Sequence, residues 1–254
     1  MFPTISIITP TLNQVAFIEQ TIRSVLDQQY PSVEYIVIDG GSTDGTLDVL
    51  KKYERRLTWV SEPDLGQADA INKGIQRSTG EVLAFINSDD YYLPGVFNKV
   101  AGVFMKKPDC QWMTGDYMIV NQHNHPIQSF VVTYKRIIRR FPGLGTLKLT
   151  NYISQPSTFW RRNVHEEIGR FNITYRYAFD YDFWLRLMIA YPPCYIKESI
   201  SAFRVHSMSK GGKEYRYQFD EELKVLGKYN CSRLDYLLHK VHNEMIVGIY
   251  RWIK

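Results

Sequence analysis

Aspartate side chains stand at a few points of this 254-residue sequence where they could hold a cation and a phosphorylated ligand. Asp89 and Asp90 close a short polar segment directly after an apolar run, and Asp39 also follows an apolar run directly. Carboxylates bind Mg²⁺ or Mn²⁺ together with phosphate oxygens, so we predict a divalent metal site at Asp89 with Asp90 in support. Asp180, far along the chain, has the chemistry of a general base.

The elements that must position these side chains alternate between strands and helices over the first 120 residues. This order predicts an α/β domain with a parallel sheet and helices on its faces. We expect strands at 5–9, 33–38, 57–60 and 82–86. Ligands of such sheets bind at the carboxyl ends of the strands. Polar segments fall at three of those ends, so we expect these segments to meet: 9–13, 39–45 and 87–90.

Local patterns predict further helices and their ends. Asn13 is expected to cap the first helix, with Leu12 and Phe17 as a hydrophobic staple, and Pro94 is expected to open another helix. Asp180 should lie near a helix N-terminus, because apolar residues recur at helical spacing after it. From about Ser232 the tail predicts an amphipathic helix, which either packs on the domain or lies on a membrane surface.

Composition indicates a globular protein with a sizeable core, since 44% of the residues are hydrophobic and 22% are charged. The three cysteines form no CxxC pair, so we expect neither a disulfide framework nor a zinc site, and a reducing compartment. The chain shows no basic leader, and no apolar run approaches the roughly 20 residues of a spanning helix. A cytoplasmic protein is therefore expected.

The net charge of +5 hides an asymmetry between the two halves of the chain. Residues 1–130 hold 10 Lys and Arg against 15 Asp and Glu, whereas residues 131–254 hold 21 against 11. An acidic half suits cation binding, and a basic half suits a diphosphate or an anionic lipid surface. No nucleic-acid partner is expected, because no nucleic-acid-binding motif accompanies the basic charge.

Six motifs together resemble the family 2 glycosyltransferases with the GT-A fold. They are ITPTLN at 8–13, IDGGSTDGT at 38–46, DLGQADAINKG at 64–74, NSDD at 87–90, FDYDFWLRL at 179–187 and FRVH at 203–206. The third is similar to a bacterial O-antigen and capsule branch of that family. The resemblance implies a GT-A domain over 1–210 with a mixed, mostly parallel central sheet and helices on both faces. Its nucleotide-binding half is expected at 1–120 and its acceptor-side half at 121–210. A C-terminal helical tail over 211–254 lies outside it.

The resemblance implies inverting transfer of a sugar from a nucleotide diphosphate sugar, with a UDP-sugar expected, to a hydroxyl acceptor. Asp180 is the implied base, and the implied Mn²⁺ or Mg²⁺ ligands are Asp89, Asp90 and His206. The implied donor-binding residues are Thr9, Pro10, Thr11, Asn13, Asp39, Gly40, Asp64, Gln67, Asn72, Asn87 and Ser88. The implied acceptor-side residues are Gln155, Pro156 and Asp182. Together with the basic tail, this suggests a lipid-linked glycan acceptor in surface polysaccharide biosynthesis, on the inner face of the cell membrane.

Several of these residues have a structural alternative. Asp90 could cap the next helix, and Asp64 could be an ordinary turn aspartate. Asp182 would be structural or a supporting partner, because residues two apart do not share a helix face with Asp180. His206 could ligate the metal or donate to the diphosphate.

The chain departs from the family pattern at three positions, which leaves the donor open. Leu12 stands where an aromatic residue often stacks on the base, Ile71 where an arginine often faces the phosphates, and Asn87 where aspartate is common. Two other functions remain open. A sugar nucleotidyltransferase would use a glycine-rich basic loop after the first strand, where this chain has TLNQ, and a non-catalytic carbohydrate-binding module could retain the same fold.

Overall fold

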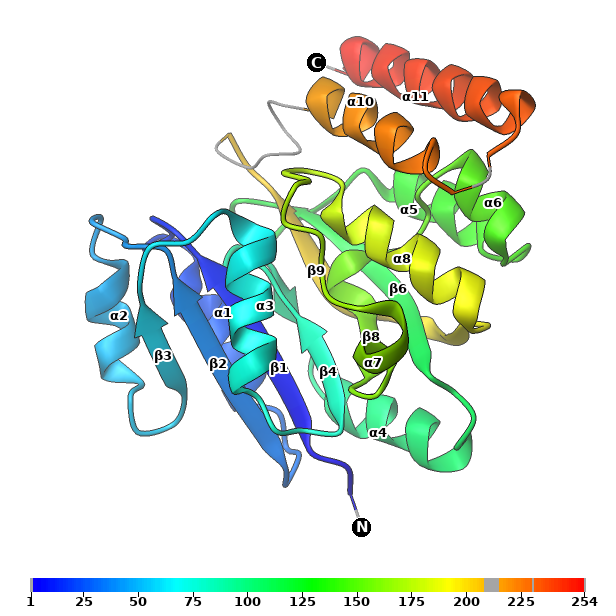
Figure 1. The fold of residues 1–254 in the computed structure, drawn as a ribbon. Coiled ribbons are helices and arrows are strands. Elements are labelled where there is room, and N and C mark those ends of the chain that lie inside the picture. Colours follow the sequence, from blue (N-terminus) through cyan, green and yellow to red (C-terminus); the bar gives the residue numbers. More distant parts are fainter. Residues whose placement is uncertain (1, 208–214, 230, 254) are drawn as a thin grey trace.

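The structure is a computed structural model that describes residues 2–207, 215–229 and 231–253. A nine-stranded sheet runs through these residues in the order β3-β2-β1-β4-β8-β6-β9-β5, with β7 paired to β6. Figure 1 shows helices on both faces of this sheet and two C-terminal helices at one end of the molecule. The expected α/β class with a mixed sheet is confirmed.

The first half of the chain forms the parallel part of the sheet. Its strands are β1 (Ile5–Thr11), β2 (Val33–Asp39), β3 (Thr58–Ser61) and β4 (Val82–Phe85). Its helices are α1 (Ile18–Leu26), α2 (Thr46–Lys52), α3 (Gln67–Arg77) and α4 (Val96–Lys106). β1 pairs in parallel with β2 and β4, and β2 pairs in parallel with β3. The carboxyl ends of these strands therefore lie along one edge of the sheet, where Thr11 is opposite Asp39.

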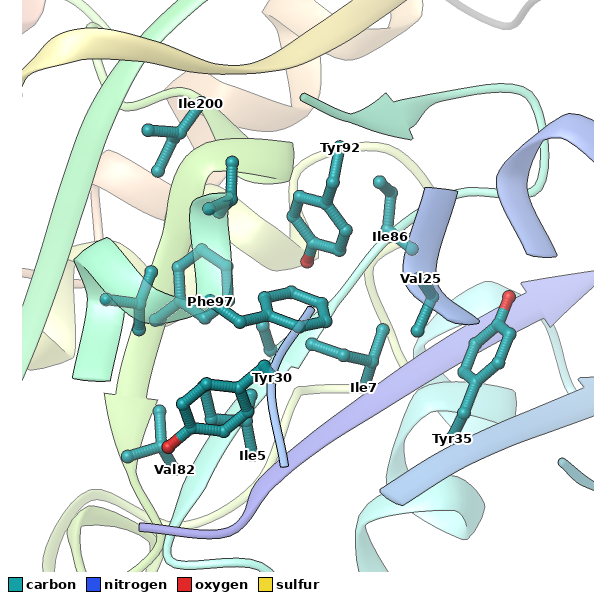
Figure 2. Packing of buried hydrophobic residues seen from close by; sticks show 14 of the residues in the cluster. Ile5, Ile7, Val25, Tyr30, Tyr35, Val82, Ile86, Tyr92, Phe97 and Ile200 are labelled. Carbon is teal, nitrogen blue, oxygen red and sulfur yellow. The ribbon is translucent and has the colours of Figure 1, made fainter. Parts of the chain in front are cut away.

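Alternate side chains of β1 enter two hydrophobic cores, one on each face of the sheet. Ile5 and Ile7 join the first core with apolar residues of α1 and α4, and Ile8 joins the second core with residues of α3. Figure 2 shows the first core, where the rings of Tyr92 and Phe97 lie with centroids 5.2 Å apart. Because both faces are buried, the strands are continuous apolar runs in the sequence.

The rest of the chain completes the sheet with mixed pairings. Its strands are β5 (Tyr91–Tyr92), β6 (Trp112–Asn121), β7 (Pro126–Ile127), β8 (Thr158–Arg161) and β9 (Cys194–Val205). Its helices are α5 (Ser129–Ile138), α6 (Leu144–Leu149), the 3-10 turn η1 (Gln155–Ser157), α7 (Val164–Ile168) and α8 (Phe179–Ala190). β6 is parallel to β9, β8 is antiparallel to β4 and β6, and β5 is antiparallel to β9.

Two helix starts differ from the prediction. α1 begins at Ile18, and Asn13 lies well ahead of it in a left-handed conformation with φ 54°, so Asn13 does not cap this helix. Asn13 Oδ1 instead accepts a hydrogen bond from Thr43 N at 2.8 Å. α4 begins at Val96, so Pro94 precedes the helix and does not open it. The apolar pattern finds both helices, but their ends depend on contacts with other loops.

The cysteines also differ from the expectation. Cys110 and Cys194 form a disulfide, with Cα atoms 6.3 Å apart and a sequence separation of 84. The prediction of no disulfide was wrong because the sheet brings the two residues together. Met113 of β6 is paired with Cys194 at the start of β9, and Cys110 lies just before β6. Cys231 is a free thiol.

The C-terminal tail contains α10 (Tyr215–Leu226) and α11 (Arg233–Ile253). α10 packs on α8 and α11, and α11 packs on α6, so α11 is the outermost helix at the top of Figure 1. α11 turns a polar side inward, with His239, His242 and Asn243 buried. His242 Nε2 lies 2.6 Å from the Tyr134 hydroxyl of α5. No helix in the described part of the chain has the length and apolar content that crossing a bilayer requires.

Candidate active site

The loop after β2 is built around the Asp39 carboxylate. Asp39 Oδ2 accepts hydrogen bonds from Gly41 N and Ser42 N, both at 2.9 Å, and from the Ser61 hydroxyl at 2.7 Å. Its Oδ1 accepts a hydrogen bond from the Ser42 hydroxyl. The side chain of Asp39 is fully buried. The carboxylate therefore fixes this loop, and a direct contact with a nucleoside would require one of these bonds to be exchanged.

Gly40 lies where the loops after three strands meet. A Cβ atom at Gly40 would lie 2.6 Å from Asp64 Oδ2 and 3.6 Å from Leu12 Cδ1, so the loops after β1, β2 and β3 approach one another there. Asp64 Oδ1 accepts a hydrogen bond from Gly66 N at 2.8 Å, just before α3. The turn role that the sequence left open for Asp64 is thus present, and its second oxygen faces Gly40. Glycine leaves the backbone open to close approach at this edge of the sheet.

Asp89 and His206 are in direct contact. His206 Nε2 lies 2.9 Å from Asp89 Oδ2, across 117 positions of sequence. The pairing of β5 with β9 creates this contact, because β5 directly follows the NSDD segment and His206 directly follows β9. The side chain of Asp89 is 17% exposed and that of His206 is 2% exposed. Two of the three predicted metal ligands are therefore neighbours, and Asp89 is the more accessible of them.

Asp90 lies beneath this pair and is buried. Its Oδ1 accepts a hydrogen bond from Arg204 N at 2.8 Å, and its Oδ2 accepts one from Asn87 Nδ2 at 3.3 Å. Burial raises the pKa of Asp90 well above its ordinary value, and the charge of Asp89 adds to the rise. α4 has no side-chain cap, so Asp90 does not cap that helix. Asp90 supports the cluster and leaves Asp89 to face a cation.

Gln67 connects α3 to the same cluster. Gln67 Nε2 donates a hydrogen bond to Asn87 Oδ1 at 2.6 Å. Asn87 in turn contacts Asp90, which holds the backbone of Arg204. The segments 64–74, 87–90 and 203–206, which the sequence analysis identified separately, therefore share one hydrogen-bond network.

The donor set at Asp89 and His206 fits a divalent cation whose other ligands are phosphate oxygens. A carboxylate oxygen suits Mg²⁺ or Mn²⁺, and an imidazole nitrogen is also a ligand for transition metals. Over the ranges 2–207, 215–229 and 231–253, no group of three or more His, Cys, Asp or Glu side chains is placed to hold a metal. A cation at this pair would therefore take its remaining ligands from water or from the oxygens of a bound diphosphate.

Asp180 lies in the first turn of α8, as predicted. Burial raises the pKa of Asp180 to about 7, and the nearby Glu222 carboxylate adds to the rise. Asp180 Oδ1 accepts a hydrogen bond from Tyr181 N at 2.7 Å. A carboxyl group whose pKa is close to neutrality is well matched to proton abstraction from a hydroxyl.

Aromatic packing joins α8 to the end of β4. Phe179, which precedes Asp180, lies against Phe85, with ring centroids 6.1 Å apart. Phe85 O accepts a hydrogen bond from Gln155 Nε2 at 2.7 Å. Phe85 is two residues before Asn87 in the chain. The predicted base, the predicted acceptor-side residue Gln155 and the NSDD segment therefore extend from one packed cluster.

Two residues that we expected at the ligand are used inside the protein instead. Asn72 Nδ2 donates to Phe171 O at 2.8 Å, and Asn72 Oδ1 accepts from Phe171 N at 3.1 Å, so this amide holds the chain ahead of α8. The Asp182 carboxylate contacts Arg186 at 2.7 Å and accepts a hydrogen bond from the Tyr229 hydroxyl at 2.6 Å. Asp182 is therefore structural, which is the alternative that the sequence left open.

Other residues predicted to bind the sugar donor or the acceptor are buried or hydrogen-bonded within the protein. The Thr9 hydroxyl lies 3.0 Å from the Tyr35 hydroxyl, and Ser88 O accepts a hydrogen bond from the Thr21 hydroxyl at 3.0 Å. The side chains of three more are buried: Pro10, Thr11 and Pro156. These residues shape the backbone at the carboxyl edge of the sheet.

Arg204 and Glu221 are neighbours of the site that the sequence analysis missed. The Arg204 guanidinium lies between the rings of Phe17 and Tyr91, 4.7 and 5.4 Å from their centroids. Its place in the FRVH segment, two residues before His206, was an available signal. Glu221 of α10 accepts a hydrogen bond from Arg176 N ahead of α8, and no motif in the sequence marks it.

The acidic segment after β4, the parallel sheet before it and the histidine after β9 define a GT-A fold of the type that nucleotide-sugar transferases use. Residues 6–169 match the family model described as Glycosyl transferase family 2, and the chain belongs to this family. The family expectation drawn from the motifs is confirmed.

Named relatives agree with the surface-polysaccharide branch. A protein of Bacillus subtilis (strain 168), "Putative teichuronic acid biosynthesis glycosyltransferase TuaG", is 38% identical over 133 residues, which are 51% of this chain and 52% of that protein. The PGL/p-HBAD biosynthesis glycosyltransferase of Mycobacterium bovis (strain BCG / Pasteur 1173P2) is 30% identical over 189 residues, 72% of this chain and 69% of that protein. The match thus spans about half the length of the B. subtilis relative.

Solved structures share the fold. The mannosyltransferase PcManGT from Pyrobaculum calidifontis, in complex with GDP-Man and Mn²⁺, has a TM-score of 0.72 and 18% identity, covering 96% of this chain and 69% of that chain. S. aureus TarS 1-349 in complex with UDP-GlcNAc has a TM-score of 0.65 and 19% identity, covering 88% and 65%. The GT-A fold predicted from the sequence is confirmed.

Proposed function

We propose that this protein transfers a sugar from a nucleotide diphosphate sugar to a hydroxyl acceptor with inversion at the anomeric carbon. The contact between Asp89 and His206 carries the proposal, because it places a carboxylate and an imidazole at the carboxyl edge of a GT-A sheet. Asp180, with a pKa of about 7, adds a base on the adjoining helix.

The donor is proposed to lie across the loops after β1, β2 and β3, with its diphosphate at Asp89. Asp89 and His206 would hold Mn²⁺ or Mg²⁺, which supplies positive charge to the diphosphate when bound. A UDP-sugar is the proposed donor. S. aureus TarS 1-349 binds UDP-GlcNAc and PcManGT binds GDP-Man, so competition between UDP and GDP for the chain is the direct measurement.

Asp180 is proposed to act as the base of a single displacement. The acceptor oxygen forms a bond to the anomeric carbon while its proton moves to the Asp180 carboxylate. The bond between the anomeric carbon and the phosphate oxygen breaks, and its electron pair leaves with the nucleoside diphosphate. Attack from the face opposite the leaving group inverts the configuration.

Product analysis tests the function directly. The full chain, Mn²⁺ and a set of UDP- and GDP-sugars are incubated with a hydroxyl acceptor, and the released nucleotide is identified. Nucleoside diphosphate together with an inverted glycoside is the expected result. Release of pyrophosphate would assign a nucleotidyltransferase, and binding without turnover over a broad acceptor panel would assign a non-catalytic module.

A lipid-linked glycan at the inner face of the cell membrane is the proposed acceptor, and one face of α11 supports this. Five exposed apolar side chains follow helical spacing on that face, here called the α11 apolar face: Leu234, Leu237, Leu238, Val241 and Met245. Exposed Arg233 and Lys240 lie on the same helix. An apolar helix face with basic residues beside it favours binding to an anionic membrane surface.

Sedimentation with vesicles of phosphatidylglycerol and phosphatidylcholine tests the membrane contact. The doubly substituted variant Leu237→Glu with Leu238→Glu should lose most vesicle binding and keep its fold, since both side chains are exposed. Met105→Glu on α4, also at an exposed apolar residue, is the matched control and should bind like the unmodified chain. Unchanged sedimentation of the double variant, or a change in its oligomeric mass, would contradict a membrane role for this face.

A further inference from the structure

Glu221 of α10 holds the backbone that leads into α8. Glu221 Oε1 accepts a hydrogen bond from Arg176 N at 3.0 Å, and Oε2 accepts hydrogen bonds from Tyr177 N at 2.5 Å and from Ala178 N at 2.7 Å. Ala178 is the N-cap of α8 and makes no side-chain cap of its own. A carboxylate from another helix therefore satisfies the N–H of the N-cap residue and two N–H groups in the chain just ahead of the helix.

Asp180 lies two residues after Ala178, in the first turn of this same helix. The backbone ahead of Asp180 is also held by the Asn72 amide through Phe171. Glu221 thus completes a framework that determines where the first turn of α8 begins and, through it, where the Asp180 carboxylate points.

Glu222, the next residue of α10, is buried on the helix that packs against α8, and its charge raises the pKa of Asp180. Gln218 Nε2 donates to Glu222 Oε1 at 3.1 Å, and His239 Nε2 of α11 lies 3.3 Å from Glu222 Oε2. His239 Nδ1 lies 2.8 Å from Lys148 O, and since a carbonyl oxygen can only accept, Nδ1 carries a proton there. One imidazole of α11 therefore lies against both the Glu222 carboxylate and the Lys148 carbonyl of α6.

We propose that the two C-terminal helices are part of the catalytic apparatus, with Glu221 as a positioning residue for Asp180 and Glu222 as the charged group that tunes it. This inference rests on the proposed role of Asp180 as base. It assigns a function to residues that lie beyond the family match at 6–169.

The charged groups near Asp180 determine whether a substitution raises or lowers its pKa. The Glu222 carboxylate raises the pKa of Asp180, whereas Lys135 of α5 lowers it, and burial is the largest cause of the rise. Replacing Glu222 by a neutral amide removes one negative neighbour and therefore lowers the pKa of Asp180. The ionised, proton-accepting form of Asp180 is then present at lower pH.

Substitutions on α10 test the positioning role by kinetics. Glu221→Gln removes the charge and puts an NH₂ group against backbone donors, so kcat should fall roughly 10- to 100-fold while the donor KM stays within about twofold. Glu221→Asp keeps the charge and should retain more of kcat than Glu221→Gln. Asp220→Asn removes an exposed charge from the same helix and is the matched control, with unchanged kcat. An undiminished kcat in Glu221→Gln, or equal losses in Glu221→Asp and Glu221→Gln, overturns the positioning role.

The tuning role has a readout that needs no turnover. In the full chain, a ¹³C NMR titration of the Asp180 carboxyl should give a midpoint near pH 7, and Glu222→Gln should move it to lower pH by roughly one unit. Asp220→Asn should leave the midpoint in place. If the Asp180 midpoint does not move in Glu222→Gln, Glu222 does not influence Asp180, even if the enzyme is active. If the midpoint moves but the chain transfers no sugar, the effect of Glu222 on Asp180 stands and only the proposed function is refuted.

Discussion

His206 Nε2 lies 2.9 Å from Asp89 Oδ2, although 117 positions separate the two residues in the chain. The short strand β5 and the last strand β9 are paired, and they place the end of the NSDD segment beside the residue that follows β9. The nucleotide-binding half and the late part of the chain thus meet at one carboxylate. A cation at Asp89 would therefore couple donor binding to the position of β9.

Asp89→Asn should abolish metal-dependent donor binding, because the exposed carboxylate of the pair is lost. His206→Gln should weaken it about 10- to 100-fold, as expected when a metal ligand or its direct partner is removed. Isothermal titration with UDP and Mn²⁺, with and without chelator, measures both effects. Retention of chelator-sensitive binding by Asp89→Asn would remove Asp89 from the metal site. His123→Gln, at an exposed histidine near β7, is the matched control.

Asp180→Asn should lower kcat by at least about 10³-fold while metal-dependent donor binding stays within a few-fold, because the amide cannot accept a proton. In the unmodified enzyme kcat should rise with pH through about 7, since Asp180 must be ionised to act. A pH-independent kcat between pH 5 and pH 8 would argue against Asp180 as the base.

The same substitution should raise stability at alkaline pH. The pKa of Asp180 is raised from 3.8 to about 7 in the folded protein, so the folded state binds this proton more tightly than the unfolded state. Its contribution to the free energy of unfolding is therefore greatest below the lower value and is lost as pH rises through about 7. At pH 8, Asp180→Asn should be more stable than the unmodified chain by on the order of 1–3 kcal/mol in chemical denaturation. At pH 4 the difference should nearly vanish.

The parallel half of the fold was predictable because its signals are local, and short motifs marked two residues that the fold brings into contact. Apolar runs marked β1 and β4, and the NSDD and FRVH segments marked Asp89 and His206. The role of Asn72 was not predictable, because its partner Phe171 is distant in sequence and carries no motif.

The disulfide and the α10 contacts escaped the sequence for the same physical reason. Cys110 and Cys194 become neighbours only after β6 and β9 pair, and Glu221 reaches the start of α8 only after α10 packs on it. Periodicity identified the tail as amphipathic but could not show which side is buried. The buried side of α11 holds His239 and Asn243, which hydropathy alone would place in water.

Asn72→Ala should destabilise the protein without weakening donor binding. The N–H and C=O groups of Phe171 would lose the partners that Asn72 supplies, at a cost of about 1–3 kcal/mol. Chemical denaturation measures this loss, and UDP titration should give an affinity within about threefold of the unmodified chain. Gln76→Ala, at an exposed position of α3, is the control. A large loss of affinity with unchanged stability would restore Asn72 to the donor site.

Arg204→Met should affect both stability and the pH dependence of donor binding. The buried guanidinium donates to Gln20 Oε1 at 2.6 Å and to Asn124 Oδ1 at 2.8 Å, so its removal breaks two hydrogen bonds and takes a positive charge away from Asp90. A loss of about 2–4 kcal/mol in the free energy of unfolding is expected, and Arg204→Lys should lose part of that because it lacks the planar fork.

The charge of Arg204 also lowers the pKa of Asp90, against the larger effect of burial. Without that charge the pKa of Asp90 rises further, so the ionised form of the carboxylate cluster is reached at higher pH. Metal-dependent UDP binding by Arg204→Met should therefore shift to higher pH, whereas Arg204→Lys, which keeps the charge, should follow the unmodified profile. If both variants shifted equally, the shift would come from altered packing around Phe17 and Tyr91, and the charge of Arg204 would have no part in donor binding.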